Sequence, residues 1–174
     1  MNTNIFSTME KKTDLWKTPE EAVNVIVPYI KKYFKDKIVW CPFDDENSNF
    51  VKIFKKENIK VVFSHIDNNQ DFFKYEPENW DIMVSNPPFS LKDKILKRAY
   101  DLNKPFALIL PIFSLSGKYR WNLFRDKKLQ VLITKNRICF IPPDIVENKY
   151  NRPPFESGYF AYKFFEEQIN FENE

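Results

Sequence analysis

Four consecutive residues, Asn86-Pro87-Pro88-Phe89, combine two carbonyl acceptors with a rigid backbone and an aromatic ring. The side-chain carbonyl of Asn86 and the backbone carbonyl of Pro87 can both accept hydrogen bonds from one amino group. The prolines have fixed φ angles and no N–H, so these carbonyls are presented rigidly. An amine conjugated to a ring is a poor nucleophile, and two acceptors concentrate charge on its nitrogen. The alternative interpretation is a plain Pro-Pro turn.

The four residues follow an apolar strand predicted at Trp80–Ser85 and precede an amphipathic helix predicted at Leu91–Leu102. In this context they resemble the catalytic motif of the amino-methyltransferases, in which Asn, Asp or Ser is followed by Pro-Pro and an aromatic residue. The resemblance implies that all four are catalytic, in methyl transfer from S-adenosyl-L-methionine to an amine. It also implies that Phe89 stacks on a base flipped out of the duplex, which is worth roughly 1–3 kcal/mol. No general base is required before the transfer.

A second segment, residues 41–50, follows the first predicted strand. Together with Asn86-Pro87-Pro88-Phe89-Ser90 it resembles the EcoRI-type adenine-specific DNA methyltransferases, over about residues 14–115. The resemblance makes this second segment the cofactor loop. Its expected cofactor-binding residues are Cys41, Pro42, Phe43, Asp44, Asp45 and Asn49, and Asn86 is expected to reach the cofactor as well.

This loop departs from the usual methyltransferase pattern because it contains no glycine. The whole chain has only two glycines, so a Gly-rich loop that cradles phosphate is excluded. The Asp44-Asp45 pair can instead hold the ammonium group of the methionine moiety. A solvated acidic turn is the alternative interpretation.

The segment before the first helix is a further candidate for cofactor binding. Thr18 is predicted as the N-cap and Pro19 as the first helical residue of a helix that runs to about Phe34. Thr18-Pro19 is similar to the segment that touches the methionine carboxylate in related enzymes, and with Lys17 the helix N-terminus makes an anion site. A plain helix cap is the alternative. Trp16 either covers the cofactor or packs in the core.

More cofactor contacts are expected after the second predicted strand. Related enzymes place an acid there for the ribose hydroxyls, and here Asp67 is displaced by one or two residues. His65, the only histidine, is also a cofactor-binding candidate, although a lone histidine is more often structural. Asp71-Phe72-Phe73 resembles the acidic-aromatic motif that binds the cofactor's adenine. A helix cap followed by core aromatics is the alternative.

Two segments carry the residues expected to contact a nucleic-acid substrate. Residues 118–121 interleave cations with aromatic rings, although a charge run is usually a solvated face. The Pro-rich stretch 141–157 is the candidate substrate-recognition loop. The expected substrate-binding residues are Phe89, Ser90, Lys118, Tyr119, Arg120, Lys149 and Arg152.

Apolar strands alternate with helices along the chain, a pattern that predicts an α/β fold with a mostly parallel sheet covered on both faces. In such sheets ligands bind at the carboxyl ends of the strands. The resemblance narrows this to the Rossmann-like class I methyltransferase fold, in one domain over residues 1–174 with a flexible lead-in at 1–14. The predicted strands are Lys37–Cys41, Lys60–His65, Asp81–Ser85, Phe106–Pro111, Leu129–Ile133 and Tyr159–Phe164, and a further helix is predicted at Phe50–Lys56.

The bulk composition indicates a globular cytoplasmic protein. Of 174 residues, 43% are hydrophobic and 29% charged, and no apolar run is long enough for a membrane span or a signal sequence. The two cysteines lie far apart and have no metal-ligand spacing, so we expect reduced thiols and no metal. The net charge of +3 permits a nucleic-acid partner without requiring one.

These observations favour a DNA adenine-N6 methyltransferase with S-adenosyl-L-methionine as cofactor, associated with restriction-modification or with a phage. An RNA adenine or protein glutamine N-methyltransferase would use the same motif. A catalytically inactive binding protein on a methyltransferase fold is the third hypothesis, and retention of the cofactor distinguishes it from the others. Little chain remains beyond the catalytic region, so target recognition is expected from the loop 141–157, a separate partner or a second copy of the chain.

Overall fold

The computed structural model describes residues 14, 16–142 and 154–173. The helices are α2 (Glu20–Tyr33), α3 (Asn49–Lys56), α4 (Lys92–Asp101) and α5 (Lys118–Lys127). The strands are β1 (Val39–Cys41), β2 (Val61–Phe63), β3 (Ile82–Ser85), β4 (Phe106–Pro111), β5 (Gln130–Ile133), β6 (Ser157–Tyr162) and β7 (Ile169–Phe171). Three short 3₁₀ helices are η1 (Ile66–Asn68), η2 (Phe89–Leu91) and η3 (Ile112–Leu115).

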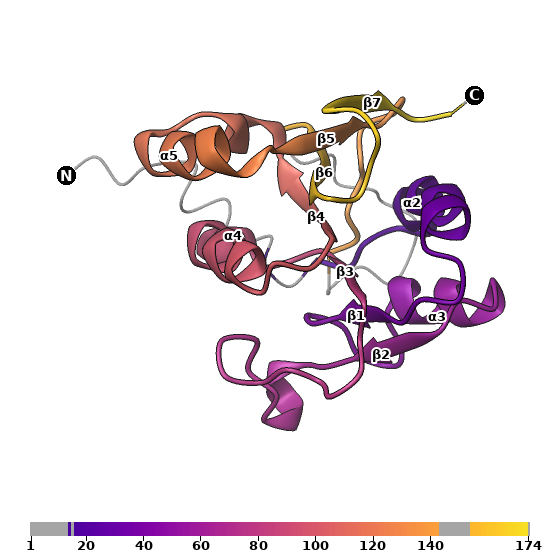
Figure 1. The fold of residues 1–174 in the computed structure, drawn as a ribbon. Coiled ribbons are helices and arrows are strands. Elements are labelled where there is room, and N and C mark those ends of the chain that lie inside the picture. Colours follow the sequence, from indigo (N-terminus) through magenta and orange to yellow (C-terminus); the bar gives the residue numbers. More distant parts are fainter. Residues whose placement is uncertain (1–13, 15, 143–153, 174) are drawn as a thin grey trace.

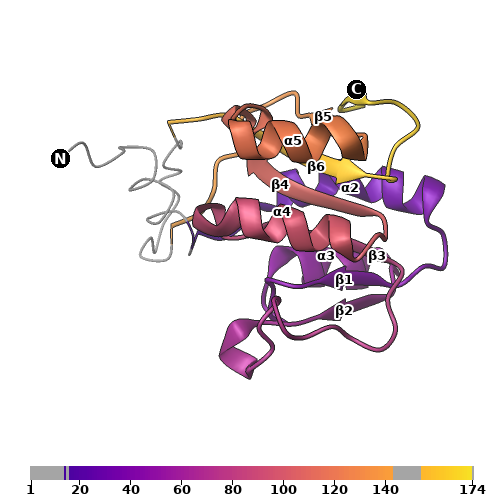
Figure 2. The same cartoon turned by 60° about the vertical axis from the view of Figure 1, so that its left-hand side comes forward.

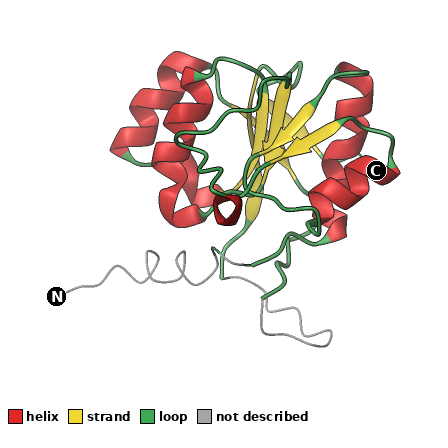
Figure 3. Ribbon diagram, turned by 90° about the horizontal axis from the view of Figure 1, so that it is seen from below, coloured by secondary structure: helices red, strands yellow, loops and turns green. Residues whose placement is uncertain are grey.

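The seven strands form one sheet in the order β2-β1-β3-β4-β6-β5-β7. Helices α4 and α5 cover one face of this sheet, and α2 and α3 cover the other (Figure 1, Figure 2). Figure 3 shows the sheet between the two helical layers. Four strand pairs are parallel, and only β6 runs antiparallel to both of its neighbours, β4 and β5. The prediction of a mostly parallel α/β sheet with two covered faces is confirmed.

The central strands are buried at every position because helices pack on both of their sides. Strand β4 occupies the predicted bounds, Phe106–Pro111. The largest buried side chain, Trp40 of β1, packs on Trp80 with their ring centroids 4.9 Å apart. Its indole N–H donates to the Ser64 hydroxyl over 3.0 Å, so the polar atom of this core residue is satisfied.

Helix α2 begins one residue later than expected. Its N-cap is Pro19, with no side-chain cap, so the prediction that Thr18 caps the helix is wrong. The reason is that Lys17 pairs in an antiparallel bridge with Ile141, which keeps the chain extended up to Pro19. The helix then continues through Pro28, with acids in its first turn and lysines in its last, as its dipole favours.

Two elements were not predicted, and one strand was displaced. Residues 118–127 form α5, which contributes no buried residue, and Ile169–Phe171 form the edge strand β7. Strand β6 begins at Ser157 and ends at Tyr162, two residues earlier at each end than predicted. It passes close to β5, and a Cβ atom on Gly158 would lie 2.9 Å from the Leu132 carbonyl oxygen.

No helix in the described part of the chain is long and apolar enough to cross a membrane.

Candidate active site

The predicted cofactor loop, the end of β2 and the Asn86 motif meet at the carboxyl edge of the sheet, as parallel strands require. A cavity of about 190 Å³ lies there. It is lined by Asp14, Trp16, Lys17, Thr18, Phe43, Asp44, Asp45, Asn47, Ser48, Asn49, Phe50, His65 and Asn86. The structure therefore brings together most of the residues expected to bind cofactor and the first residue of the expected catalytic motif.

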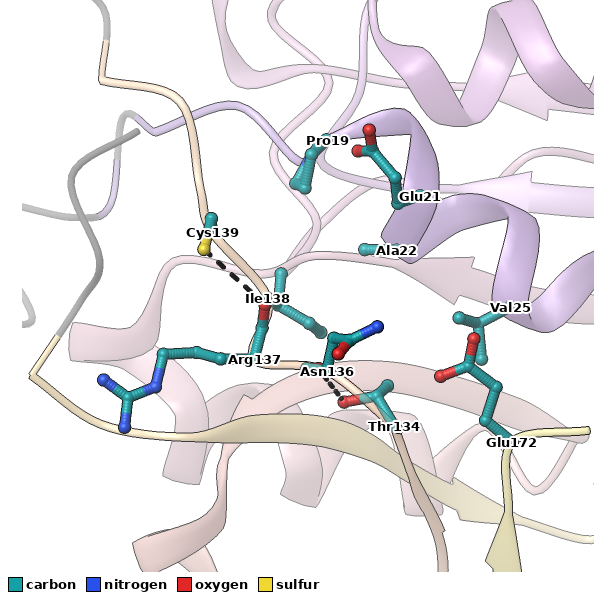
Figure 4. A pocket seen from close by; sticks show the side chains of 10 residues that line it. All are labelled: Pro19, Glu21, Ala22, Val25, Thr134, Asn136, Arg137, Ile138, Cys139 and Glu172. Atoms are coloured by element: carbon teal, nitrogen blue, oxygen red, sulfur yellow. Dashed lines mark hydrogen bonds between the residues drawn. The ribbon is translucent and has the colours of Figure 1, made fainter. Parts of the chain in front are cut away.

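A larger cavity, of about 300 Å³, lies between the first turns of α2 and residues 134–139 (Figure 4). Its walls include Ala22, Val25 and Ile138, and none of the residues 86–89 reaches it. The smaller cavity is the better candidate for chemistry, because an active site needs convergent polar groups as well as a hollow.

Asp44 is the buried polar centre of the smaller cavity. Its carboxylate accepts a 2.5 Å hydrogen bond from the Ser85 hydroxyl, and its backbone N–H donates to the Ser64 carbonyl over 3.2 Å. Desolvation by burial raises the pKa of Asp44 to about 6, and hydrogen bonds from Ser85 and Ser48 partly offset this rise. Asp44 thus joins the ends of β1, β2 and β3, through its backbone N–H to Ser64 and its carboxylate to Ser85. The carboxylate remains poorly solvated, so a cation in the cavity would be a favourable partner.

The side-chain carbonyl oxygen of Asn86 is buried and accepts no hydrogen bond from the described residues. A buried acceptor without a partner costs roughly 1–3 kcal/mol, so native structures seldom keep one without a reason. Asn86 also lines the cavity. Its oxygen is therefore positioned for a donor that a ligand would bring.

The ring of Phe89 lies in the core instead of facing the cavity. Its side chain is 3% exposed, with its centroid 5.7 Å from that of Phe140 and 5.9 Å from that of Phe155, both edge to face. The preceding Pro88 is the N-cap of η2. Stacking of Phe89 on a base therefore requires one of the covering rings to move.

Asp14 and residues 16–18, together called the strap, lie along one side of the cavity. The Asp14 carboxylate accepts from the backbone N–H of Ser90 over 3.1 Å and from its hydroxyl over 2.5 Å. The Asn49 amide donates to the Thr18 carbonyl over 2.8 Å. The strap thus connects the predicted cofactor loop with the residue that follows the predicted catalytic motif, a connection that the sequence did not reveal.

His65 and Asp67 form a local cap. The backbone N–H of Asp67 donates to Nδ1 of His65 over 3.3 Å at the start of η1. His65 lines the cavity, whereas Asp67 does not, and the Asp67 side chain is 84% exposed. The structure therefore places the expected ribose-binding acid outside the cavity.

The Asp71-Phe72-Phe73 segment is a turn outside the cavity. Oδ1 of Asp71 accepts from the Phe73 N–H over 3.0 Å. Phe72 is buried and packs on Phe43, with centroids 4.9 Å apart, while Phe73 is 36% exposed. Only Phe72 approaches the site, through its contact with Phe43. Cys41 is also buried outside the cavity lining, and burial raises the pKa of its thiol.

The expected substrate-binding residues are divided. Lys118 and Tyr119 lie exposed at the start of α5. Arg120 is instead engaged, because its guanidinium pairs with Asp93 over 2.7 Å and donates to the backbone carbonyls of residues 114 and 116. Lys149 and Arg152, together with most of the predicted recognition loop, lie outside the described residues.

Sequence reasoning also missed four polar residues at this site: Asp14, Asn47, Ser48 and Ser85. Ser48 caps α3 by accepting from the N–H of Val51 over 3.3 Å, and a serine three residues before an apolar position is a detectable helix start. Ser85 directly precedes Asn86, but its partner Asp44 is 41 residues away in sequence. That contact has no local signal.

No protein-family model matches the chain. The type II methyltransferase M.EcoRI of Escherichia coli is 25% identical to it over 189 residues, which cover 79% of this chain and 58% of that protein. The chain therefore spans less than two thirds of that relative's length. The sheet order, the layers of helices and this distant relative agree with a Rossmann-like methyltransferase fold.

Proposed function

We propose that the protein is an S-adenosyl-L-methionine-dependent methyltransferase that modifies the N6 amino group of adenine in DNA. The observation that carries the proposal is the buried carbonyl oxygen of Asn86, which has no hydrogen-bond partner among the described residues and lies at the cavity. The distant relationship to a type II methyltransferase supports the same reaction.

The residues around the cavity fit the amino-acid end of this cofactor. The buried Asp44 carboxylate provides a partner for the ammonium group. The N-terminus of α2, beside Lys17 and Thr18, provides a positive region for the carboxylate. Phe43 adds an apolar wall. When bound, the cofactor supplies an electrophilic methyl group on a sulfonium.

Asn86 and Pro87 orient the amine in this proposal. Oδ1 of Asn86 accepts one amino hydrogen and the backbone carbonyl of Pro87 accepts the other, so that the nitrogen lone pair is held in one direction. The same two hydrogen bonds stabilise the positive charge that develops on the nitrogen. No side chain has to remove a proton first, which leaves His65 free for its structural role at η1.

Phe89 stacks on the base only after one of the two rings that cover it shifts. Phe140 and Phe155, which cover it, lie on either side of residues 143–153 in the sequence. Entry of a flipped base is therefore coupled to movement of Phe140, just before the predicted recognition loop, or of Phe155 within it. The gain from stacking, roughly 1–3 kcal/mol, is of the size needed to displace one edge-to-face aromatic contact.

The test is transfer of labelled methyl from S-adenosyl-L-methionine to adenine-containing duplex DNA, with Asn86→Ala as the variant. Loss of one preorganised acceptor should lower the transfer rate about 100-fold or more. Asn79→Ala is the matched control, because Asn79 is exposed and precedes the opposite end of β3.

Unchanged transfer by Asn86→Ala would contradict the assigned role of the amide oxygen. Cofactor binding without transfer to DNA would redirect the search to RNA and to protein glutamine. Absence of cofactor binding would indicate an inactive binding protein on this fold.

A further inference from the structure

Helix α5 is unusual because none of its ten residues is buried. Lys118, Trp121 and Arg125 follow each other at spacings of three and four residues, so they lie on one side of the helix. Trp121 is 57% exposed, and the Arg125 guanidinium lies 4.6 Å from the centroid of its indole ring. An exposed aromatic ring flanked by cations is the combination that nucleic-acid-binding surfaces use, with the ring for stacking and the cations for phosphates.

The charge of the protein is concentrated on the same segment. Residues 118–128 contain five Lys or Arg residues and one Asp, a net charge of +4, whereas the whole chain carries only +3. The rest of the chain is therefore slightly acidic. This local excess attracts a polyanion to α5 in particular and not to the surface in general.

Two contacts hold α5 with this face outward. Arg120, whose side chain is 14% exposed, pairs with Asp93 of α4, and the Phe124 ring packs on Phe160 with centroids 6.2 Å apart. Gly117, at φ 119°, allows the chain to turn into the helix, and a Cβ atom there would meet Nη2 of Arg120 at 2.8 Å. The exposed stripe is thus preorganised by the opposite side of the helix.

A groove with lysines from α4 lies beside the first turn of α5, although one of them, Lys97, pairs with Asp101. This shallow groove of about 540 Å³ is lined by Lys94, Lys97 and Tyr119, among other residues, and α4 and α5 lie side by side on one face of the sheet (Figure 2). The first turn of α5 follows the carboxyl end of β4, the neighbour of the strand that ends at Asn86. From Lys118 to Arg125 the helix rises about 10 Å, a span on the scale of neighbouring phosphates.

We propose that the stripe Lys118–Trp121–Arg125 binds the backbone of the DNA outside the target adenine. Lys118 and Arg125 pair with phosphates, and Trp121 packs on a sugar or base between them. This inference rests on the proposed function in taking DNA as the substrate. It assigns binding energy to a helix face and excludes Arg120, whose side chain is only 14% exposed and pairs with Asp93. Arg125 also pairs with a carboxylate, that of the adjacent Asp126, but both of these side chains are more than half exposed, so a phosphate can compete for the guanidinium.

The experiment measures fluorescence-anisotropy titrations of a labelled duplex at a series of salt concentrations. The variant is Lys118→Ala with Arg125→Ala, and its control is Lys52→Ala with Lys56→Ala, two exposed lysines of α3 on the opposite face. Each lost phosphate contact reduces the slope of log affinity against log salt by about 0.9, so the α5 variant should lose about 1.8 and the control nothing. DNA should quench the tryptophan fluorescence of the wild-type protein, and in Trp121→Phe this quenching should be smaller because the stacked indole is absent.

Equal salt slopes for the two double variants, or no DNA binding by the wild type, would overturn the proposal. Binding of poly-glutamate as tightly as DNA would also overturn it, in favour of an acidic protein partner. The failure of this inference can be told apart from the failure of the proposed function. If transfer depends on Asn86 but the salt slope of the α5 double variant equals that of the wild type, only the α5 surface is contradicted. An altered slope without transfer contradicts only the proposed reaction.

Discussion

Replacing Asp44 by asparagine should stabilise the protein and weaken its binding of S-adenosyl-L-methionine. Burial raises the pKa of this carboxyl from 3.8 to about 6, so its ionised form is disfavoured in the folded state. Below pH 3.8 the carboxyl is protonated in both the folded and the unfolded protein, and the free energy of unfolding has its full value. As the pH rises from 3.8 through about 6, the free energy of unfolding falls, because ionisation is easier in the unfolded chain. Two pKa units correspond to about 3 kcal/mol, which is the upper limit of the cost at pH 7.5.

Asparagine cannot ionise, and its carbonyl can still accept the hydrogen bond from the Ser85 hydroxyl. We therefore expect Asp44→Asn to raise the free energy of unfolding of the ligand-free protein by up to about 3 kcal/mol at pH 7.5, or the melting temperature by roughly 6–12 °C. At pH 5 the gain should be about half as large, since the wild-type carboxyl is then protonated in the folded state. Urea unfolding at both pH values measures the difference.

The same substitution removes the partner of the cofactor's ammonium group. Loss of a charged hydrogen bond of about 1.5–3 kcal/mol should weaken S-adenosyl-L-methionine binding roughly 10- to 100-fold in calorimetric titration. In the wild type the affinity should fall as the pH drops below about 6, where Asp44 becomes protonated.

Asp81→Asn is the matched control, because the pKa of Asp81 is shifted in the opposite direction and its replacement should change the free energy of unfolding with the opposite sign. The Ile38 backbone N–H donates to the Asp81 carboxylate and lowers its pKa, with Lys37 contributing in the same direction. Its stabilisation is present above the ordinary pKa and is lost as the pH falls, so Asp81→Asn should destabilise the protein at pH 7.5. If Asp44→Asn gave no gain, or the same gain at pH 5 and 7.5, the reasoning from burial would be refuted.

Three other substitutions test separate contacts. Asp14→Asn leaves one acceptor oxygen for the two donors of Ser90, so the transfer rate should fall roughly five- to tenfold, about 1 kcal/mol, with cofactor affinity unchanged. Phe89→Leu keeps an apolar side chain but removes two edge-to-face ring contacts, so it should cost about 1–3 kcal/mol in urea unfolding, while kcat/KM for DNA falls roughly 5- to 100-fold because stacking is lost. Gly158→Ala should lower the free energy of unfolding by about 1–3 kcal/mol, because the new methyl group meets the Leu132 carbonyl oxygen at 2.9 Å.

Each of these has a result that would contradict it. An equal loss of cofactor affinity and transfer rate in Asp14→Asn would mean that the strap supports the fold and not the motif. Full activity of Phe89→Leu would leave Phe89 as a core residue only. An unchanged melting temperature for Gly158→Ala would show that β5 and β6 can separate at no cost.

The elements that sequence predicted well are those with strong local patterns. Strand β4 is a continuous apolar run and lies within its predicted bounds, and the turn at Asn86 follows the β3 strand as expected. The cavity at the strand ends follows from parallel topology once the strands are known. These features depend on the periodicity of neighbouring residues, which the sequence displays directly.

The features that were missed depend on contacts between distant residues. Helix α5 has no buried apolar face that a sequence pattern could reveal. It is held instead by two contacts with distant residues, the ion pair of Arg120 with Asp93 and the packing of Phe124 on Phe160. Thr18 is a good N-cap by residue type, yet the bridge between Lys17 and Ile141 keeps it extended. The burial of Phe89 under two rings likewise depends on residues more than fifty positions away.

The most direct test of the central claim is identification of the methylated nucleoside by mass spectrometry, after reaction of duplex DNA with S-adenosyl-L-methionine that carries a deuterated methyl group. We expect N6-methyladenine that carries the deuterated methyl group, and we expect this product to be absent with Asn86→Ala. A deuterated methyl on cytosine carbon, or on no nucleoside although the protein binds the cofactor, would contradict the assignment of adenine in DNA as the substrate.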